Sequence, residues 1–333
     1  MKATNRYSKT FGKLLVVLLI VSLYVSTMAP SVVFGQGVPN GNEYVKAVPI
    51  YDTYEEAQAA AKDLNIELTG EGSVLLKNDG VLPLSTSRKI TVFGAAATSL
   101  QGGSGRVTTA LEDAGFSVNP TVVTESNYNS TSDTVIKKYG DAAVVVLKRG
   151  GGEGSDLSVS TNENANDANE NIGGWEHKRL AISGGNQKKH YQMLTASEIA
   201  MIEKAKATCK AVVVLLNTSN TMEMYNLEHD DGIDAIMFIG RPGANGVTAV
   251  GKLISGAMNP SGKTADIWYK DFTADPTWYN SIANVQNDGG SNSYIDEDGS
   301  ASNGMHGVDY EEDIYLGYGY YESVYAEILA GRL

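Results

Sequence analysis

A glutamate surrounded by glycines is the residue of this sequence best suited to chemistry. Glu153 lies in the segment RGGGEGSD at positions 149–156, shortly after the apolar run Ala143–Leu147. Glycines on both sides let a substrate approach the backbone and leave the carboxyl group unobstructed. Such a carboxyl group can donate and accept protons in catalysis. A glycine turn that carries a solvated acid fits the local pattern as well, and the local sequence does not decide between the two.

A second glycine-rich segment, QGGSGR at positions 101–106, follows the apolar run Ile90–Gly94. Neither segment has the spacing G-x-G-x-x-G or G-x-x-x-x-G-K-[ST] of phosphate-binding loops, and a central carboxylate repels phosphate. A nucleotide site is therefore disfavoured. Ligands of open α/β sheets bind at the carboxyl ends of strands, where both segments are expected to lie.

The elements that must position these segments alternate between strands and helices. Short, continuously apolar runs are typical of strands buried on both faces of a parallel sheet, and they occur at Ile90–Gly94, Ala143–Leu147, Ala211–Leu216 and Asp234–Ile239. Helices are expected at Thr53–Leu64, Val107–Ala114, Thr195–Ala207 and Asn245–Ser255. Thr195 and Glu198 have the spacing of a capping box, and Gly256 is expected to end the last helix. The pattern predicts an α/β fold with a mostly parallel sheet flanked by helices.

The N-terminal residues have the features of an export segment. Four basic residues and no acid precede an apolar stretch over positions 14–34. Its length leaves a cleaved signal peptide and an uncleaved membrane anchor both open. We expect the protein to be secreted or held on the extracellular face of the cell membrane. The predicted organisation is a signal or anchor at 1–35, a linker at 36–50, and a domain that begins at 51. The domain consists of 51–275, with a polar insertion at 157–190, and of a polar loop and Tyr-rich segment at 276–333.

Charge and composition narrow the possible partners. The net charge is −13, and because the first 35 residues contribute four positive charges, the remainder carries −17. Such a body repels nucleic acid but is compatible with a neutral sugar. Cys209 is the only cysteine, and we expect it to be a buried, inert thiol. The four histidines show no metal-ligand spacing, so neither a metal nor another cofactor is expected.

Seven segments together resemble family 3 of the glycoside hydrolases, which includes β-glucosidases. The resemblance covers residues 70–322 apart from two polar stretches, and the segments occur in the family's order. They are GSVLLKNDGVLPL at 72–84, QGGSGR at 101–106, RGGGEGSD at 149–156, VVVLLNTSNTMEM at 212–224, GRPGANG at 240–246, NPSGK at 259–263 and YEEDIYLGYGYYE at 310–322.

The resemblance implies an α/β-sandwich domain that carries the general acid/base of a retaining β-glucosidase-like hydrolase. The position of the family's acid/base matches Glu153. Arg149, Asp156, Gln101 and Ser104 are the expected substrate-binding residues, for which loop geometry or a counter-ion role are the alternatives. The family's nucleophile is an Asp on a (β/α)₈ barrel, and this chain has no room for such a barrel. We therefore expect the nucleophile outside this chain, on a barrel in trans or in a longer chain, as in permuted members whose α/β domain comes first.

Three positions depart from the family's pattern, namely Gly151 in place of Ser, Thr221 in place of Pro and Gly319 in place of Arg. They bear on activity more than on the fold. The expected function is hydrolysis of O-glycosyl bonds in a β-glucoside or oligosaccharide. The alternative is a catalytically incomplete, membrane-anchored module that binds carbohydrate or another protein.

Overall fold

The computed structural model describes residues 50–150, 192–272, 275 and 313–332, together with two short strands at 294–295 and 301–302. The predicted signal or anchor and the polar insertion lie outside the described residues. Within the described residues, no helix is both long enough and apolar enough to cross a bilayer. The chain divides into two compact units at the boundary between Leu64 and Asn65. The second unit contains the predicted site.

A six-stranded sheet forms the centre of the second unit, in the order β1-β6-β5-β4-β2-β3. The strands are β1 (Val74–Asn78), β2 (Lys89–Phe93), β3 (Ser117–Val118), β4 (Ala142–Arg149), β5 (Val212–Thr218) and β6 (Ala235–Phe238). Every neighbouring pair is parallel except β1 with β6. The predicted α/β fold with a mostly parallel sheet is confirmed.

The strand order reverses between β2 and β4. From β2 the chain passes to β3 on one side, then crosses to β4 on the other side and continues outward through β5 to β6. A reversal of this kind is a topological switch point, where open α/β sheets bind their ligands. The loops after β2 and β4 are the two segments with the glycine-rich sequences. The topology therefore places both of them at the switch point.

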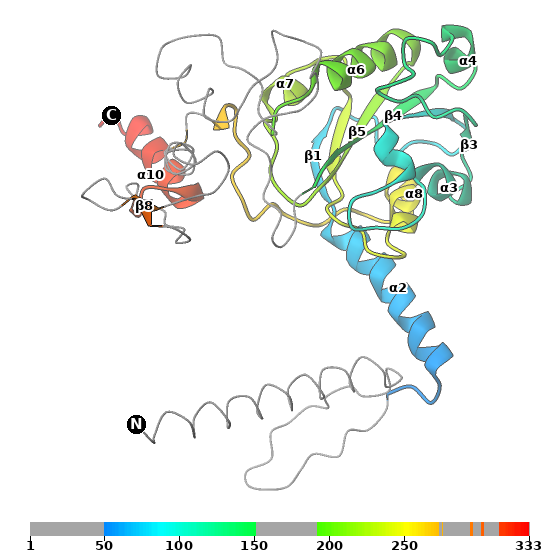
Figure 1. Ribbon diagram of the computed structural model, residues 1–333, viewed down its shortest axis with the longest axis horizontal. Coiled ribbons are helices and arrows are strands. Elements are labelled where there is room, and N and C mark those ends of the chain that lie inside the picture. Colours follow the sequence, from blue (N-terminus) through cyan, green and yellow to red (C-terminus); the bar gives the residue numbers. More distant parts are fainter. Residues whose placement is uncertain are drawn as a thin grey trace, which may run out of the picture. The chain divides into compact units, whose positions relative to one another are not determined.

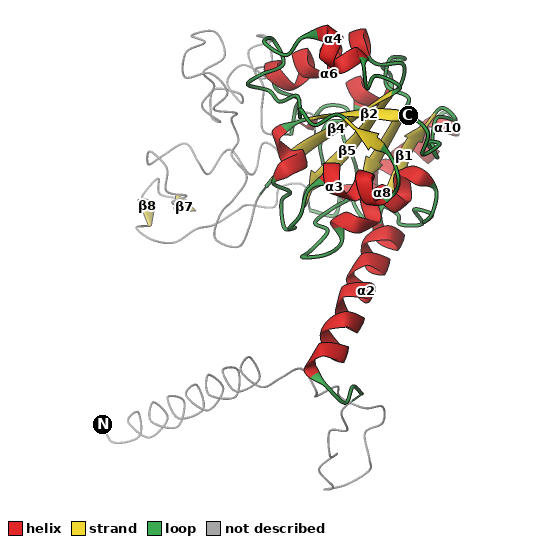
Figure 2. Cartoon of the chain, turned by 90° about the vertical axis from the view of Figure 1, so that its right-hand side faces the viewer, coloured by secondary structure: helices red, strands yellow, loops and turns green. Residues whose placement is uncertain are grey.

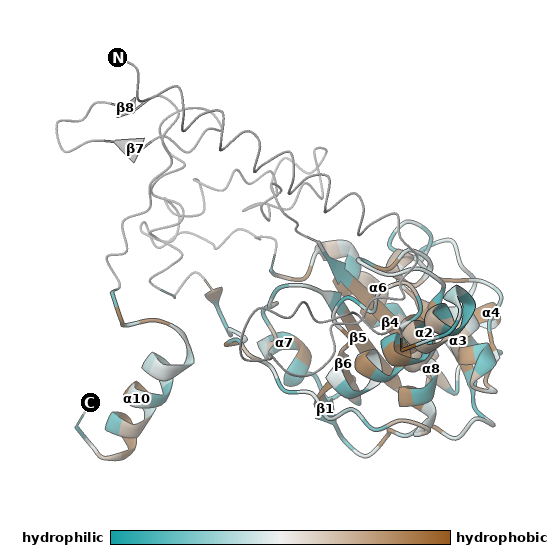
Figure 3. Ribbon diagram, turned by 90° about the horizontal axis from the view of Figure 1, so that it is seen from below, coloured by the Kyte–Doolittle hydropathy of each residue, from teal (hydrophilic) through white to brown (hydrophobic). Residues whose placement is uncertain are grey.

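Helices cover both faces of the sheet (Figures 1 and 2). The helices α3 (Val107–Asp113) and α8 (Val247–Ser255) pack on one face, and α4 (Asp133–Lys137), α6 (Ala196–Thr208) and α7 (Tyr225–Glu228) pack on the other. Successive side chains of β4 point to opposite faces of the sheet: Val144 packs with the cluster of α3 and α8, and Val145 packs with the cluster of α6. Hydrophobic colouring accordingly marks the central strands in Figure 3. Burial on both faces explains why these strands are continuously apolar.

Two predicted helix ends agree with the structure and one does not. Thr195 and Glu198 form a complete capping box at the start of α6, and Gly256 ends α8 with φ of 80°. The predicted end of the first helix at Leu64 is wrong, because α2 spans Tyr54–Gly72. It continues because its last turns have tertiary partners, such as the hydrogen bond of Thr69 Oγ1 to the carbonyl of Pro242 (3.1 Å).

Several short elements carry no sequence signal that we recognise. The antiparallel edge strand β1, the two-residue β3 and the short α4 and α7 belong to this group. The Tyr-rich segment contains the helix α10 (Gly317–Leu329), in which no residue is buried. Its Tyr321 hydroxyl donates to Asp275 Oδ2 (2.8 Å). The strands β7 (Tyr294–Ile295) and β8 (Ala301–Ser302) form a separate antiparallel pair.

Candidate active site

The structure brings the two glycine-rich segments into contact at the switch point. Gln101, in the loop after β2, is half-buried and lies against Gly150, which follows β4 directly. A β-carbon at position 150 would lie only 2.7 Å from Oε1 and 2.8 Å from Cδ of Gln101. Glycine at position 150 therefore allows the Gln101 amide to lie over the backbone. Two segments far apart in the sequence thus meet where a ligand is expected.

Asn217, near the end of β5, joins the loops that cross the carboxyl edge of the sheet. Its fully buried amide accepts a hydrogen bond from the Gln101 N–H (2.5 Å) and donates to the carbonyls of Gln101 (3.1 Å) and Gly240 (2.7 Å). One side chain therefore fixes the loops after β2 and β6 to β5. We call Asn217 with these partners the Asn217 junction.

Ser104 is exposed and takes part in a loop-to-loop contact. Its hydroxyl donates a hydrogen bond to the carbonyl of Ala244, and its N–H donates to the carbonyl of Gly243 (3.3 Å). On the other side, Asn65 of α2 donates to the carbonyl of Pro242 (2.9 Å) and accepts from the N–H of Asn245 (2.9 Å). The GRPGANG segment is thus held between α2 and the loop of Ser104.

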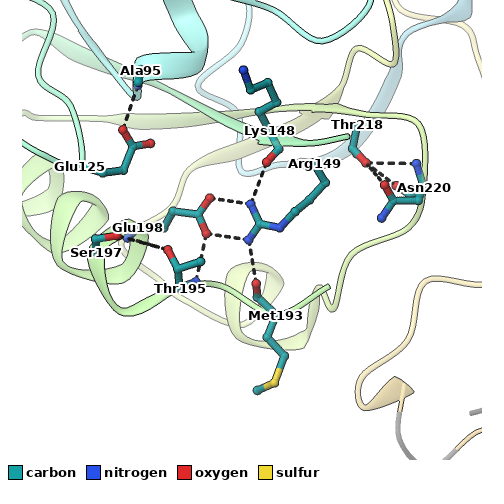
Figure 4. A network of polar contacts seen from close by, with 10 residues as sticks. All are labelled: Ala95, Glu125, Lys148, Arg149, Met193, Thr195, Ser197, Glu198, Thr218 and Asn220. Carbon is teal, nitrogen blue, oxygen red and sulfur yellow. Dashed lines mark hydrogen bonds and ion pairs between the residues drawn. The ribbon is translucent and has the colours of Figure 1, made fainter. Parts of the chain in front are cut away.

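Arg149, the last residue of β4, forms a buried ion pair with Glu198 of α6 (Figure 4). Nη1 donates to Oε1 of Glu198 (2.6 Å) and Nη2 donates to Oε2 (2.7 Å). The same guanidinium donates to the carbonyls of Lys148 (2.9 Å) and Met193 (2.7 Å). Arg149 therefore has a carboxylate counter-ion within the fold. Its two terminal nitrogens thus bind one backbone carbonyl at the end of β4 and one just before α6.

Glu153 and Asp156 lie outside the described residues, so their predicted roles stay predictions. Of the five predicted site residues, the structure places Gln101 against Gly150, and Arg149, which precedes Gly150, in an ion pair with Glu198. Ser104 lies in the loop of Gln101 but contacts Ala244. Among the described residues, no three His, Cys, Asp or Glu side chains gather closely enough to hold a metal ion.

Sequence reasoning misses three polar residues at this edge of the sheet. It interprets Glu198 only as part of a capping box, and it ends the predicted strand at Leu216, one residue before Asn217, which the structure places inside β5. Glu125 accepts a hydrogen bond from the N–H of Ala95 (3.0 Å), just beyond β2. An asparagine directly after an apolar run such as VVVLL is a usable signal of a polar contact at the strand end, because a buried amide must find partners.

Comparison with known proteins identifies the domain. Residues 73–318 match the family described as "Glycosyl hydrolase family 3 C-terminal domain". The chain belongs to glycosyl hydrolase family 3. The match confirms the resemblance, and it spans both glycine-rich segments and the Asn217 junction.

The relatives of this family 3 domain are longer proteins. Beta-glucosidase A of Butyrivibrio fibrisolvens is 25% identical over 323 residues, which cover 85% of this chain and 35% of the relative. A beta-glucosidase of Ruminococcus albus is 24% identical over 77% of this chain and 26% of its own length. The solved structure of beta-glucosidase 3B from Thermotoga neapolitana superposes with a TM-score of 0.57 at 22% identity, covering 83% of this chain and 37% of that one. The chain thus spans about a third or less of the length of the curated relatives named here.

Proposed function

We propose that this domain supplies the acid/base half of a retaining β-glycosidase site, with Glu153 as the proton donor. The observation that carries the proposal is the contact of Gln101 with Gly150 at the switch point. That contact brings the loop after β2 to the start of the segment in which Glu153 lies, three residues further along the chain. Family membership supplies the class of chemistry.

The proposed reaction divides the work between two carboxyl groups. In a retaining glycosidase, a carboxylic acid protonates the leaving oxygen while a carboxylate about 5–5.5 Å away attacks the sugar. The acid then acts as a base and activates the water that releases the sugar. Glu153 performs both proton transfers in our proposal. The nucleophile comes from a (β/α)₈ barrel outside this chain, in a longer protein or in trans.

The remaining predicted residues have different proposed parts. Gln101 is the described residue best placed to bind a sugar hydroxyl, because its half-buried amide combines a donor and an acceptor. Asp156 is proposed to accept a hydrogen bond from the sugar. Ser104 lines the rim through its loop. Arg149, which already binds Glu198, contributes by holding the backbone beside the substrate.

The substrate class and the location are also proposals. The relatives include beta-glucosidases and beta-D-xylosidase 1 of Arabidopsis thaliana. We propose a β-glucoside or a related oligosaccharide, which suits an acidic protein better than an anionic ligand does. The N-terminal basic and apolar segment supports export, with the domain secreted or at the extracellular face of the membrane.

Hydrolysis of 4-nitrophenyl β-D-glucoside tests the proposal, with the protein alone and mixed with a separately produced family 3 barrel domain. We expect turnover only in the mixture, with loss of turnover in Glu153→Ala. Glu112→Ala, which removes an exposed acid of α3, is the matched control and should stay active. Equal turnover in Glu153→Ala and the native protein would exclude Glu153 as the acid. Absence of turnover in every mixture would favour the binding-module alternative.

A further inference from the structure

A buried ion pair joins the last residue of β4 to the first turn of α6. The side chains of Arg149 and Glu198 are only 4% and 8% exposed. Both terminal nitrogens of the guanidinium face both oxygens of the carboxylate, at 2.6 and 2.7 Å. This fork-to-fork geometry fixes orientation as well as distance.

Both partners of the ion pair also bind backbone groups next to it. Nη1 of Arg149 donates to the Lys148 carbonyl (2.9 Å), and Nη2 reaches across to the Met193 carbonyl (2.7 Å). Oε2 of Glu198 accepts from the Thr195 N–H (3.0 Å). The pair therefore ties the chain where it leaves β4 to the chain where it enters α6. Figure 4 shows the guanidinium with Lys148, Met193 and Glu198 around it, and Thr195 beside the Glu198 carboxylate.

Stability alone does not explain such a pair. Removing two charges from water costs free energy that their attraction often only offsets, so an apolar pair of similar volume is frequently as stable. An apolar pair has no directional hydrogen bonds, so it does not fix the orientation of the backbone next to it. Gly150 follows Arg149 directly, and a β-carbon there would lie only 2.7 Å from Gln101 Oε1, so the orientation of the backbone matters at this point.

We propose that Arg149 and Glu198 are positioning residues: they hold Gly150 against Gln101 and fix the orientation of the backbone where it leaves β4. The catalytic part of this inference rests on the proposed function. The geometric part concerns described residues only and stands without turnover. The Glu198 carboxylate has two roles, because its Oε2 accepts hydrogen bonds both from the N-cap residue of α6 and from Arg149.

Three variants separate position from stability. The double variant Arg149→Met with Glu198→Leu replaces the ion pair by an apolar pair. Glu198→Gln keeps the shape but lacks the second acceptor oxygen. Thr195→Ala removes the capping hydroxyl of α6 and leaves the ion pair, so it is the matched control for a general weakening of the helix start.

Amide hydrogen exchange of the full-length chain measures the geometric part. In the double variant and in Glu198→Gln, we expect exchange at least about tenfold faster in peptides covering 147–151 and 192–196, with exchange in β5 unchanged. In Thr195→Ala only the first turn of α6 should exchange faster. Exchange at the native rate in both of these peptides of the double variant would overturn the proposal. Global unfolding of both Glu198 variants would also overturn it, because the pair would then serve stability alone.

Kinetics with the barrel domain measure the catalytic part. A misplaced acid lowers kcat and leaves substrate binding largely intact. We expect the double variant to lose at least about tenfold in kcat for 4-nitrophenyl β-D-glucoside, with KM within about threefold of the native value. An unchanged kcat beside accelerated exchange would overturn the link to catalysis. If the native mixture shows no turnover, the proposed function fails, and the exchange result still decides whether the pair positions Gly150.

Discussion

Individual glycines at the carboxyl edge of the sheet are required for different physical reasons. Gly94, which ends β2, has φ of 95°, and a β-carbon there would lie 2.2 Å from the carbonyl oxygen of Val146. Gly150 has no such backbone clash, but a β-carbon would meet the Gln101 side chain. Substitution at Gly94 therefore disturbs the fold. Substitution at Gly150 displaces a flexible side chain that belongs to the candidate site.

Gly94→Ala should lower the free energy of unfolding by about 3 kcal/mol or more, since backbone strain and a backbone clash add together. Gly80→Ala is the matched control: Gly80 has φ of 92° but open space around it. We expect the control to cost about 1–2 kcal/mol from strain alone. Urea unfolding measures both values. Equal losses in the two variants would contradict the close approach of β2 and β4.

The thiol of Cys209 should react slowly in the folded protein. Burial, the main cause, raises the pKa of the Cys209 thiol to about 11. Only the thiolate reacts, so at pH 8 the reactive fraction is about a hundredth of that for a thiol with a pKa of 9.0. A colorimetric disulfide reagent at pH 8 measures the rate before and after unfolding in guanidinium. Cys209 is half-buried rather than fully buried as the sequence predicts, and equal rates in the two states would contradict even this partial burial.

At the level of residues, the sequence predicts positions better than partners. The apolar runs predict that both glycine-rich segments lie at strand ends. The contact of Gln101 with the start of the second segment then follows from the position of β2 next to β4 in the sheet. The Glu198 carboxylate that neutralises Arg149 is not predictable in this way, because the two residues lie on separate elements and the capping box already explains Glu198. Local patterns account for local partners, whereas a buried charge pair depends on packing.

Among the elements, β5 carries the Asn217 junction, which makes loop position depend on one side chain. Asn217→Ala should lower the free energy of unfolding by about 2–4 kcal/mol, because it leaves part-buried N–H and C=O groups of the two loops without this partner. It should also accelerate amide exchange in peptides covering 99–105 and 239–245.

Asn119→Ala is the matched control for this prediction. Asn119 is also buried, but it binds Thr91 and Thr121 beside β3. We expect a stability loss without faster exchange in the two loops. If Asn119→Ala accelerated exchange in those loops as much as Asn217→Ala does, the junction would have no special part in positioning them.

The contact of α10 with the chain near Asp275 should depend on pH. The ring of Tyr269 packs edge-on against that of Tyr321 in α10. Burial, with Asp275 nearby, raises the pKa of Tyr269 to about 12, and burial also raises the pKa of Tyr321. A raised tyrosine pKa favours the neutral form in the folded state, so the stabilisation is complete below pH 10 and is lost as the pH rises toward 12. Tyrosinate absorbance of the native protein minus that of Tyr269→Phe measures the shift. Titration of Tyr269 near pH 10 would contradict it.

The type of each long element can be predicted, and the short ones cannot. Continuous apolar runs identify β2, β4, β5 and β6 because burial on both faces selects such residues. The edge strand β1 has a half-exposed pattern, and β3 has only two residues, so neither produces a periodic signal. The helix α2 extends beyond its predicted end because contacts with Pro242 hold its last turns.

At the scale of the whole molecule, family membership and the share of the relatives that the chain covers decide what can be said of activity. Seven ordered segments of the sequence indicate family 3, and the match over residues 73–318 confirms the family. The relatives are about three times as long as the matched part, so the activity of the whole enzyme is a proposal for this chain. The export segment and the acid/base lie outside the described residues and remain predictions.

Leaving-group dependence tests most directly whether Glu153 is the proton donor. Phenyl β-D-glucoside needs a general acid to expel its leaving group, whereas 2,4-dinitrophenyl β-D-glucoside does not, because dinitrophenolate is a stable anion. With the barrel domain present, Glu153→Ala should lose about 10²–10⁴-fold in kcat/KM on the phenyl substrate and less than about tenfold on the dinitrophenyl substrate. Equal losses on the two substrates, or no loss on either, would contradict the assignment of Glu153 as the acid.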